Sequence, residues 1–345
     1  MAQRKRDSAQ PPEKILAIRF ARLGDVILLL RALGSLKRKF PGSELTFLTG
    51  HRCAPIAELC PAIDHIIAVD RIAMRDGPAW RAIGQMATLV RDVRRRQFDL
   101  VVDFHSFRET NLLTWLSRAP MRIGIKRHLA PYFSFCFNHP PVIEDKSLHV
   151  ADMFQRVVAS IPSPSRQDLA SFERTTGESN RPLGRVVAEK ANVPTVALYV
   201  DAPVPERIWP ASRFAEVADF VIEKLHAAVV VISSKERPEV ARNVQEACQN
   251  SDKLSVFTDL TLPQLASVIA SAQLLVSNDT GPMHMGPALE VRTLGLFSVG
   301  YPEHFRPTGP NDRFLRGIPI ERIEVKNVLE TVEEMWTIAD RDLRR

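Results

Sequence analysis

The sequence predicts an α/β protein made of two Rossmann-like, doubly wound domains that face a cleft. Short apolar runs alternate with segments of helical periodicity over most of the 345 residues, and this alternation is typical of a parallel sheet covered by helices. The length suits two domains better than one core. A stretch rich in Ser, Pro and charge interrupts the alternation. We therefore expect residues 1–165 to form the first domain, 166–194 a linker and 195–345 the second domain.

The first domain is expected to open with a strand at Lys14–Phe20, followed after a Gly-Asp turn by a helix at Val26–Phe40. Further apolar runs predict strands, and helical spacing between them predicts the covering helices. These strands are expected at Leu45–Leu48, Ile66–Val69 and Leu100–Phe104, and the helices at Pro55–Leu59, Trp80–Arg96 and Glu109–Ser117.

The second domain repeats the same kind of alternation, without residue-level similarity to the first. Strands are expected at Val196–Val200, Ala228–Ile232, Ser255–Phe257 and Leu274–Ser277, and helices at Arg213–Leu225, Glu239–Gln249 and Pro263–Ala270. A final amphipathic helix at Val328–Ala339 is compatible with packing on the second domain or crossing back to the first. Ligands of such sheets bind beyond the carboxyl ends of the strands, so the loops there are the candidate sites.

The charge is unevenly distributed along the chain. Residues 1–150 hold 24 Lys/Arg against 14 Asp/Glu, a net charge of +10, whereas residues 151–345 hold 22 against 26, a net charge of −4. A cationic half attracts nucleic acid, an anionic membrane surface or an acidic glycan, although solubility alone explains it equally well. Nucleic acid is the weakest of these partners, because the basic half lacks interleaved aromatic residues and any recognisable nucleic-acid motif.

Targeting and metal signals are weak. No apolar run reaches the ~18 residues of a membrane span, and the polar N-terminus does not resemble a secretory signal, so a cytoplasmic location is expected. The basic tail at 4–6 permits weak electrostatic membrane attachment. No His, Asp or Glu cluster has metal-ligand spacing, and the scattered cysteines are expected to be reduced thiols. The cysteines are Cys53, Cys60, Cys136 and Cys248.

One candidate site follows the strand that ends near Ser277. A Pro at an early helical position, Pro282, marks a strand-to-helix loop whose N–H groups suit a diphosphate. Asp279 is expected to orient this loop or to accept hydrogen bonds from sugar hydroxyls, with Thr280 and Gly281 left for the phosphates. His284 could reach the same ligand. The alternative is an ordinary Asp/Thr helix cap.

A second candidate is Asp25, which lies between the first strand and the first helix. A positioned carboxylate there is a candidate general base for an attacking hydroxyl. The alternative is a helix N-cap, which Asp also favours. Acceptor binding is assigned to residues of this loop and of the loop after the strand ending at Phe104: Arg22, Gly24, His105 and Arg108.

Two further charged residues follow strands of the second domain. Arg207, just before Trp209-Pro210, could neutralise the charge that grows on a departing diphosphate, a role that a metal has in other enzymes. Glu236 could hold ribose hydroxyls. The alternatives are a surface arginine beside a packed Trp, and an ordinary loop charge.

Three motifs occur in order along the chain: ILAIRFARLGDVILLLRALGSLKRKFPGSELTFLTG, the Arg-x-Trp-Pro-x-x-x-Phe run from Arg207 to Phe214, and SNDTGPMHMGPAL. Taken together, they resemble glycosyltransferase family 9, the bacterial lipopolysaccharide heptosyltransferases. The resemblance implies a GT-B fold, an acceptor domain followed by a donor domain, and inversion at the anomeric carbon without a metal. It also implies a base at Asp25, a diphosphate contact at Arg207, and a donor loop containing Asp279, Thr280, Gly281, Met283 and His284.

The resemblance further implies an ADP-heptose donor and, as acceptor, the Kdo or heptose region of the lipopolysaccharide inner core. That acceptor is an anionic glycolipid, which would account for the basic half and for peripheral contact with the cytoplasmic face of the inner membrane. No cofactor is expected, because the nucleotide sugar is a substrate.

The loop after the first strand of the second domain departs from the family pattern. It reads Asp201-Ala202-Pro203-Val204-Pro205 where the family has a Gly-, Ser- or Thr-bearing phosphate loop, and Ser233 or Ser234 replaces a glycine after the next strand. An aspartate there is expected to repel a diphosphate. Two alternatives therefore stay open: a non-catalytic nucleotide- or glycan-binding relative, and a transferase with another donor. A Rossmann dehydrogenase is disfavoured because no G-x-G-x-x-G follows the first strand.

Overall fold

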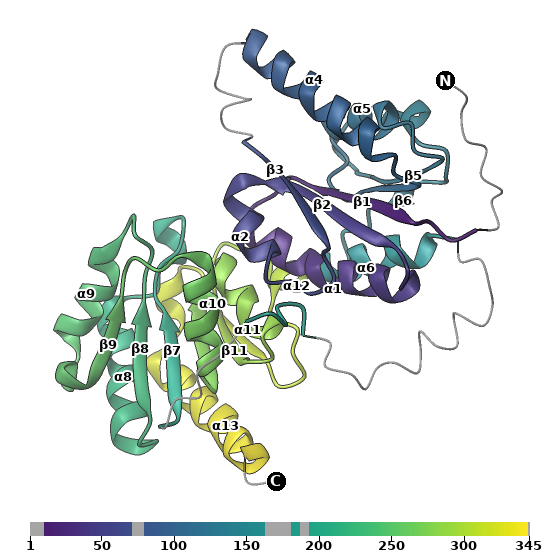
Figure 1. Ribbon diagram of the computed structural model, residues 1–345. Coiled ribbons are helices and arrows are strands. Elements are labelled where there is room, and N and C mark those ends of the chain that lie inside the picture. Colours follow the sequence, from purple (N-terminus) through teal and green to yellow (C-terminus); the bar gives the residue numbers. More distant parts are fainter. Residues whose placement is uncertain (1–9, 71–78, 163–180, 187–192, 344–345) are drawn as a thin grey trace. The chain divides into compact units, whose positions relative to one another are not determined.

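The computed structural model describes residues 10–70, 79–162, 181–186 and 193–343. The chain divides into two compact units, Met1–Gly184 and Arg185–Arg345, and each contains a parallel six-stranded sheet (Figure 1). The division lies inside the segment 166–194 that the sequence predicts as a linker. Most of that segment lies outside the described residues.

The first sheet has the strand order β3-β2-β1-β4-β5-β6, with every neighbouring pair parallel. Its strands are β1 (Lys14–Arg19), β2 (Glu44–Gly50), β3 (His65–Val69), β4 (Leu100–Asp103), β5 (Met121–Lys126) and β6 (Val142–Ile143). The chain order reverses between β1 and β4. Loops that follow these two strands therefore flank the switch point at which doubly wound sheets bind ligands.

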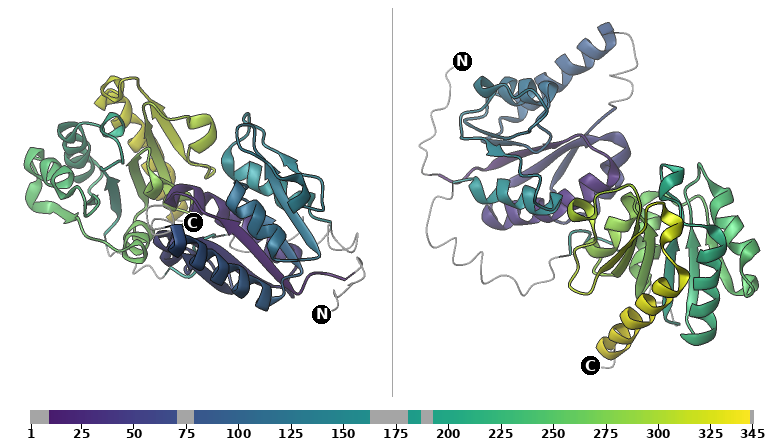
Figure 2. Two further views of the ribbon diagram at one scale, coloured as in Figure 1. Left: turned by 90° about the horizontal axis from the view of Figure 1, so that it is seen from above. Right: turned by 180° about the vertical axis from the view of Figure 1, so that it is seen from behind.

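Helices cover both faces of this sheet. They are α1 (Leu23–Lys39), α2 (Ala54–Ala57), α4 (Ala79–Arg96), α5 (Arg108–Leu116) and α6 (Val150–Ser160). Figures 1 and 2 show α4 and α5 on one face and α1, α2 and α6 on the other. Apolar side chains such as Ile18 and Val101 from the strands pack against Val93 and Leu113 from the helices, which forms the core on the α4–α5 side.

The second sheet repeats this topology, with the order β9-β8-β7-β10-β11-β12 and all pairs parallel. Its strands are β7 (Thr195–Tyr199), β8 (Ala228–Ile232), β9 (Leu254–Phe257), β10 (Leu274–Asn278), β11 (Arg292–Phe297) and β12 (Arg313–Arg316). The switch point lies between β7 and β10. The predicted α/β class with two doubly wound domains is confirmed.

The helices of the second unit are α8 (Ala211–Lys224), α9 (Pro238–Ala247), α10 (Leu262–Ser271), α11 (Met285–Ala288), α12 (Pro302–Phe305) and α13 (Val325–Leu343). The final helix, α13, places Val328, Val332 and Met335 in the same buried cluster as Trp209 and Phe214. The described side chains of α13 therefore pack within the second unit. Among the described residues, no helix is both long and apolar enough to cross a membrane.

The helix expected after Asp279 is present but short. A 3-10 turn at Gly281–His284 leads into the four-residue helix α11. Gly286 and Pro287 lie within α11, and both residue types disfavour a longer helix. A helix of one turn has little macrodipole, so individual N–H groups, rather than a helix dipole, are what this loop offers to an anion.

Candidate functional site

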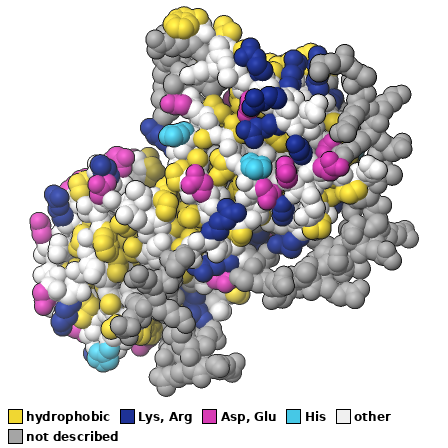
Figure 3. Space-filling model, viewed as in Figure 1, with side chains coloured by type: hydrophobic (Ala, Val, Ile, Leu, Met, Phe, Trp, Pro, Cys, Tyr) yellow, Lys and Arg dark blue, Asp and Glu magenta, His cyan; other side chains and the backbone are white. Residues whose placement is uncertain are grey.

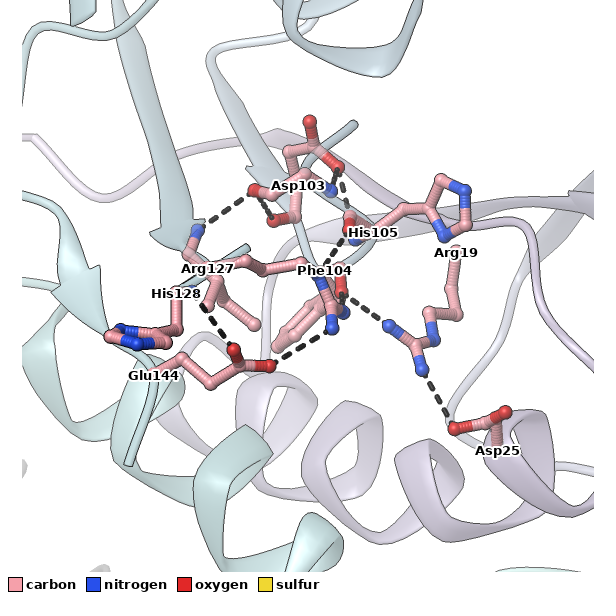
Figure 4. A network of polar contacts seen from close by, with 10 residues as sticks. Arg19, Asp25, Asp103, Phe104, His105, Arg127, His128 and Glu144 are labelled. Carbon is pink, nitrogen blue, oxygen red and sulfur yellow. Dashed lines mark hydrogen bonds and ion pairs between the residues drawn. The ribbon is translucent and has the colours of Figure 1, made fainter. Parts of the chain in front are cut away.

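Asp25 lies in the first turn of α1, directly beyond the carboxyl end of β1. Its Oδ1 is 2.8 Å from Nη2 of Arg19, and the carboxylate is 27% exposed (Figure 4). The N-cap of α1 is Arg22, without a side-chain cap, so Asp25 does not serve as the N-cap. Among the described residues no donor approaches Oδ2, which leaves that oxygen available to a substrate hydroxyl.

Arg19 connects the two loops that flank the switch point. While Nη2 contacts Asp25, Nη1 donates to the carbonyl oxygen of Phe104 at 2.8 Å, and the guanidinium lies 5.0 Å from the ring centre of Phe154. Burial lowers the pKa of Arg19, and the nearby Asp25 carboxylate opposes that effect. Arg19 was not predicted as a site residue from the sequence. The sequence does contain a signal for it: a single arginine ends the apolar strand KILAIR, and a charged residue that is buried in a central strand usually has a partner.

Asp103, at the end of β4, shapes the opposite loop. Its buried carboxylate accepts hydrogen bonds from the backbone N–H groups of His105 (3.0 Å) and Ser106 (2.7 Å), and from Nδ2 of Asn111 (3.3 Å). Ser106 has a φ of 51°, a left-handed conformation that these bonds help to hold. Burial raises the pKa of Asp103 to about 6 despite these donors.

Asp103 should make the stability of the protein depend on pH. Its folded-state pKa of about 6 lies above the ordinary value of about 3.9, so the folded protein binds the extra proton and stability falls as pH rises from about 4 to about 6. We expect the change in unfolding free energy caused by Asp103→Asn to shift by about 2 kcal/mol over this range, in favour of the variant at higher pH. Denaturant unfolding at several pH values measures it, and parallel curves for the two proteins would contradict it.

Arg127 completes the network around the Phe104 carbonyl (Figure 4). Its Nη2 reaches that oxygen at 3.3 Å, its Nε donates to the carbonyl of His105 at 2.8 Å, and its Nη1 pairs with Glu144 at 3.2 Å. Two guanidiniums therefore converge on one carbonyl oxygen and stabilise the turn between β4 and α5.

The predicted acceptor residues have different environments. His105 is buried, with its ring 5.7 Å from that of Phe20 and 4.5 Å from that of Phe107. Gly24 is buried in the first turn of α1, whereas Arg22 and Arg108 are exposed. These positions follow β1 and β4 and so belong to the loops at one switch point.

In the second unit, Arg207 and Asp279 form an ion pair at the switch point between β7 and β10. Nη1 of Arg207 lies 3.1 Å from Oδ2 of Asp279 and 3.4 Å from its carbonyl oxygen. Burial raises the pKa of Asp279, and the Arg207 charge opposes that rise. Asp279 therefore has a partner inside the protein and holds the arginine in place.

Asn278 connects the same two loops just below this pair. Its Oδ1 accepts from the backbone N–H of Trp209 at 3.2 Å, and its Nδ2 donates to the carbonyl of Val200 at 2.8 Å. Trp209 is fully buried and donates its indole N–H to the carbonyl of Ile323 at 3.0 Å. The segment that carries Arg207 is therefore fixed on both sides, as a preorganised charge requires.

The other predicted donor residues lie around this pair. Thr280 and Gly281 are half-buried, and His284 is buried. The side chain of Met283 is fully buried in the core beside Gly295, so its backbone is the part available to a ligand. Glu236 is exposed in the turn after β8. The pKa of Tyr199 is raised by burial first, then by the charge of Asp201 and then by that of Glu236.

The two departures from the family pattern compensate one another. Asp201 is buried; its Oδ1 accepts from the backbone N–H of Ala202 at 2.7 Å, and its Oδ2 accepts from the N–H and the hydroxyl of Ser234. Ser234 replaces the expected glycine. The aspartate therefore connects the loops after β7 and β8, and these bonds offset part of the repulsion that the sequence suggests.

Gly300 leaves the space that the Asp279 carboxylate fills. A Cβ at this position would lie 2.1 Å from Oδ2 of Asp279, which Arg207 holds in place. We expect Gly300→Ala to lower the unfolding free energy by about 1–3 kcal/mol, because overpacking displaces the ion pair. Gly42→Ala is the control, since nothing lies within 4 Å of its Cβ. Equal denaturation midpoints for the two variants would refute the close approach.

No group of three or more His, Cys, Asp or Glu side chains in the described part of the chain is arranged to hold a metal ion. That sugar transfer needs no metal ion stays a prediction. The ion pairs at the two switch points are Arg19–Asp25 in one unit and Arg207–Asp279 in the other.

Two doubly wound parallel sheets in one chain are the architecture of the GT-B fold. The family model of glycosyltransferase family 9 (heptosyltransferase) matches residues 86–332, and the chain belongs to this family. It is therefore a glycosyltransferase enzyme, and the non-catalytic alternative is set aside.

Relatives agree with this assignment over most of their length. Lipopolysaccharide heptosyltransferase 1 of Pseudomonas aeruginosa is 24% identical over 294 residues, covering 84% of this chain and 79% of that protein. Lipopolysaccharide heptosyltransferase 3 of Escherichia coli is 21% identical over 295 residues, covering 84% of each. The structure of E. coli heptosyltransferase WaaC with ADP-2-deoxy-2-fluoro heptose aligns with a TM-score of 0.77 at 17% identity, over 93% of this chain and 99% of that one. At this identity the structural match establishes the fold.

Proposed function

We propose that this enzyme transfers a heptose, or a similar sugar, from an ADP-sugar to an anionic acceptor in the core of lipopolysaccharide. The observation that carries the proposal is Asp25, held by Arg19 at the switch point of the first sheet with one carboxylate oxygen open. The names of the family relatives support the heptose and the lipopolysaccharide. The basic composition of residues 1–150 supports an anionic acceptor.

In the proposed reaction an acceptor hydroxyl attacks the anomeric carbon of the donor. The new C–O bond forms on the face opposite the departing diphosphate, so the configuration inverts. Asp25 removes the hydroxyl proton as this bond forms. The bond between the anomeric carbon and the diphosphate oxygen breaks, ADP leaves with the electron pair, and Arg207 stabilises the charge it gains. This requires no metal ion.

Donor identity has one competing candidate. The alternative is a transferase with a different nucleotide-sugar donor, and it is motivated by the loop Asp201-Ala202-Pro203, which departs from the phosphate loop of the family. Calorimetric binding of ADP-heptose, ADP-glucose and several UDP- and GDP-sugars without added metal separates the two. Selective binding of ADP-heptose supports the heptosyltransferase, whereas preference for another nucleotide changes the donor.

Transfer is then measured with deacylated lipopolysaccharide-core acceptors in the presence of EDTA, and the anomeric configuration of the product is read by NMR. A product of inverted configuration that forms at an undiminished rate in EDTA supports the mechanism. A retained configuration, or a rate restored only by added metal, overturns it.

A further inference from the structure

The outer surface of α4 carries apolar side chains where a helix on a sheet normally carries polar ones. Trp80 and Ile83 in its first turns are 69% and 70% exposed. Further along the same solvent-facing side come Arg91, Arg94 and Arg95, all exposed. An outer helix face that changes from aromatic and aliphatic to basic is typical of surfaces that lie in a membrane interface.

The neighbouring helix α5 continues this surface. Leu112 and Trp115, three residues apart, are both exposed, and Arg108 lies one turn before Leu112. The ring of Trp115 packs edge-on against that of Phe135 at 5.9 Å, and Phe135 is itself 60% exposed. Aromatic residues that pack with one another yet remain exposed suit the boundary between lipid and water.

The two helices meet in an apolar groove of about 540 Å³ lined by Ile83, Met86, Val90 and Leu116, with Arg91 and Arg94 beside them. Arg94 donates its Nε to the carbonyl of Leu116 at 2.7 Å, which holds the two helices together. In Figure 3, hydrophobic side chains lie at the outer end of α4 and basic ones gather over the rest of the α4–α5 region.

The charges on this surface favour an anionic lipid surface over a second copy of the chain as its partner. Across α4 and α5 the exposed or half-buried cations Arg91, Arg94, Arg95, Arg96 and Arg108 outnumber the anions Asp92 and Glu109. A second copy of the chain that docked through the same face would bring these arginines against one another, because such an interface is isologous. An anionic lipid surface is complementary both to the arginines and to the aromatic side chains.

We propose that the outer face of α4 and α5 docks on an anionic phospholipid bilayer, with Trp80, Ile83 and Trp115 entering the interface and the arginines meeting the headgroup phosphates. The purpose of this docking, which is to bring the enzyme to a glycolipid acceptor, rests on the proposed function, whereas the binding itself does not. Binding is measured without donor or acceptor, whereas transfer is measured on a deacylated acceptor, so each can fail alone.

Vesicle flotation of the full chain tests the proposal. We expect binding to phosphatidylcholine vesicles that contain phosphatidylglycerol, weak binding to pure phosphatidylcholine, and loss of binding as salt rises. Arg91→Glu should weaken binding at least about fivefold, and Ile83→Ser by about tenfold. The tryptophan emission of the wild type should shift on adding anionic vesicles, and Trp80→Phe should reduce that shift.

Matched controls are Arg31→Glu on α1, which covers the other face of the sheet, and Ile143→Ser on β6. Both replaced side chains are exposed, and both variants should bind vesicles like the wild type. The proposal is overturned if the wild type ignores anionic vesicles or if the α4 variants bind as the controls do. It is also overturned if sedimentation shows a dimer that Ile83→Ser dissociates, because a second copy would then cover this face.

Discussion

Asp25→Asn is expected to reduce turnover by a factor of about 10²–10⁴, the usual contribution of a general base, while donor affinity changes little. The amide keeps the size of the carboxylate and still offers an oxygen to Arg19, but it cannot accept the proton of the attacking hydroxyl. Initial rates with saturating donor measure the loss of turnover. Calorimetry of donor binding measures the affinity, which under the proposed function depends on groups in the second unit.

Asp64→Asn is the matched control for this prediction. Asp64 also pairs with a cation, at 2.5 Å from Nζ of Lys37, and lies in the same unit but away from the switch point. Its removal should affect stability and leave the rate per folded molecule unchanged. If Asp25→Asn retains turnover, or if the two variants lose it equally, Asp25 is not the base.

Most of the central strands and the helices beside them could be predicted, because these strands are continuous apolar runs and these helices have a clear period. Ala228–Ile232 is a strand over the predicted residues, and α8 begins and ends within two residues of the predicted helix. The buried strand β11 and the amphipathic helix α6 were missed although their sequences have ordinary signals, whereas other missed elements have weaker ones. The edge strand β12 reads RFLR and is largely exposed, so it lacks the continuous apolar run of a buried parallel strand. The two-residue β6 is too short for any period to show.

The candidate site was predicted in part for a similar reason. Asp25, Arg207 and Asp279 follow apolar strands, and the rule that ligands bind at the carboxyl ends of strands identifies such positions without coordinates. The pairing of Arg207 with Asp279, which are 72 residues apart in the sequence, was not predictable, because contacts between distant residues leave no local pattern. Arg19 reaches a carbonyl 85 residues away, and Asp201 reaches Ser234 across 33 residues. A carboxylate that looked unfavourable for phosphate binding in the sequence has a structural role in the fold.

Arg207→Met is expected to lower turnover by about 10²–10³, the usual cost of removing one group that stabilises a developing negative charge. It should also destabilise the protein by about 1–3 kcal/mol, because the buried carboxylate of Asp279 loses its partner. Steady-state kinetics and denaturant unfolding measure the two effects separately. Met replaces the aliphatic part of the arginine, so the change removes charge more than volume.

The loss of stability in Arg207→Met should depend on pH in a direction fixed by Asp279. Burial already raises the pKa of Asp279, and removing the Arg207 charge that opposes this should raise it further. A carboxyl group whose folded pKa lies above its unfolded value costs stability when it is ionised, so the deficit should be larger at about pH 8 than at about pH 5. A deficit that is constant with pH would show that Asp279 does not sense the arginine.

The double variant Arg207→Met/Asp279→Asn separates stability from catalysis. With no carboxylate left unpaired, it should recover part of the unfolding free energy at about pH 8 and lose the pH dependence that the single variant shows. Turnover should stay low, because the group that stabilises the departing diphosphate is still missing. If turnover recovers together with stability, Arg207 acts by holding the Asp279 loop in place, and the charge on the diphosphate must be stabilised by other groups.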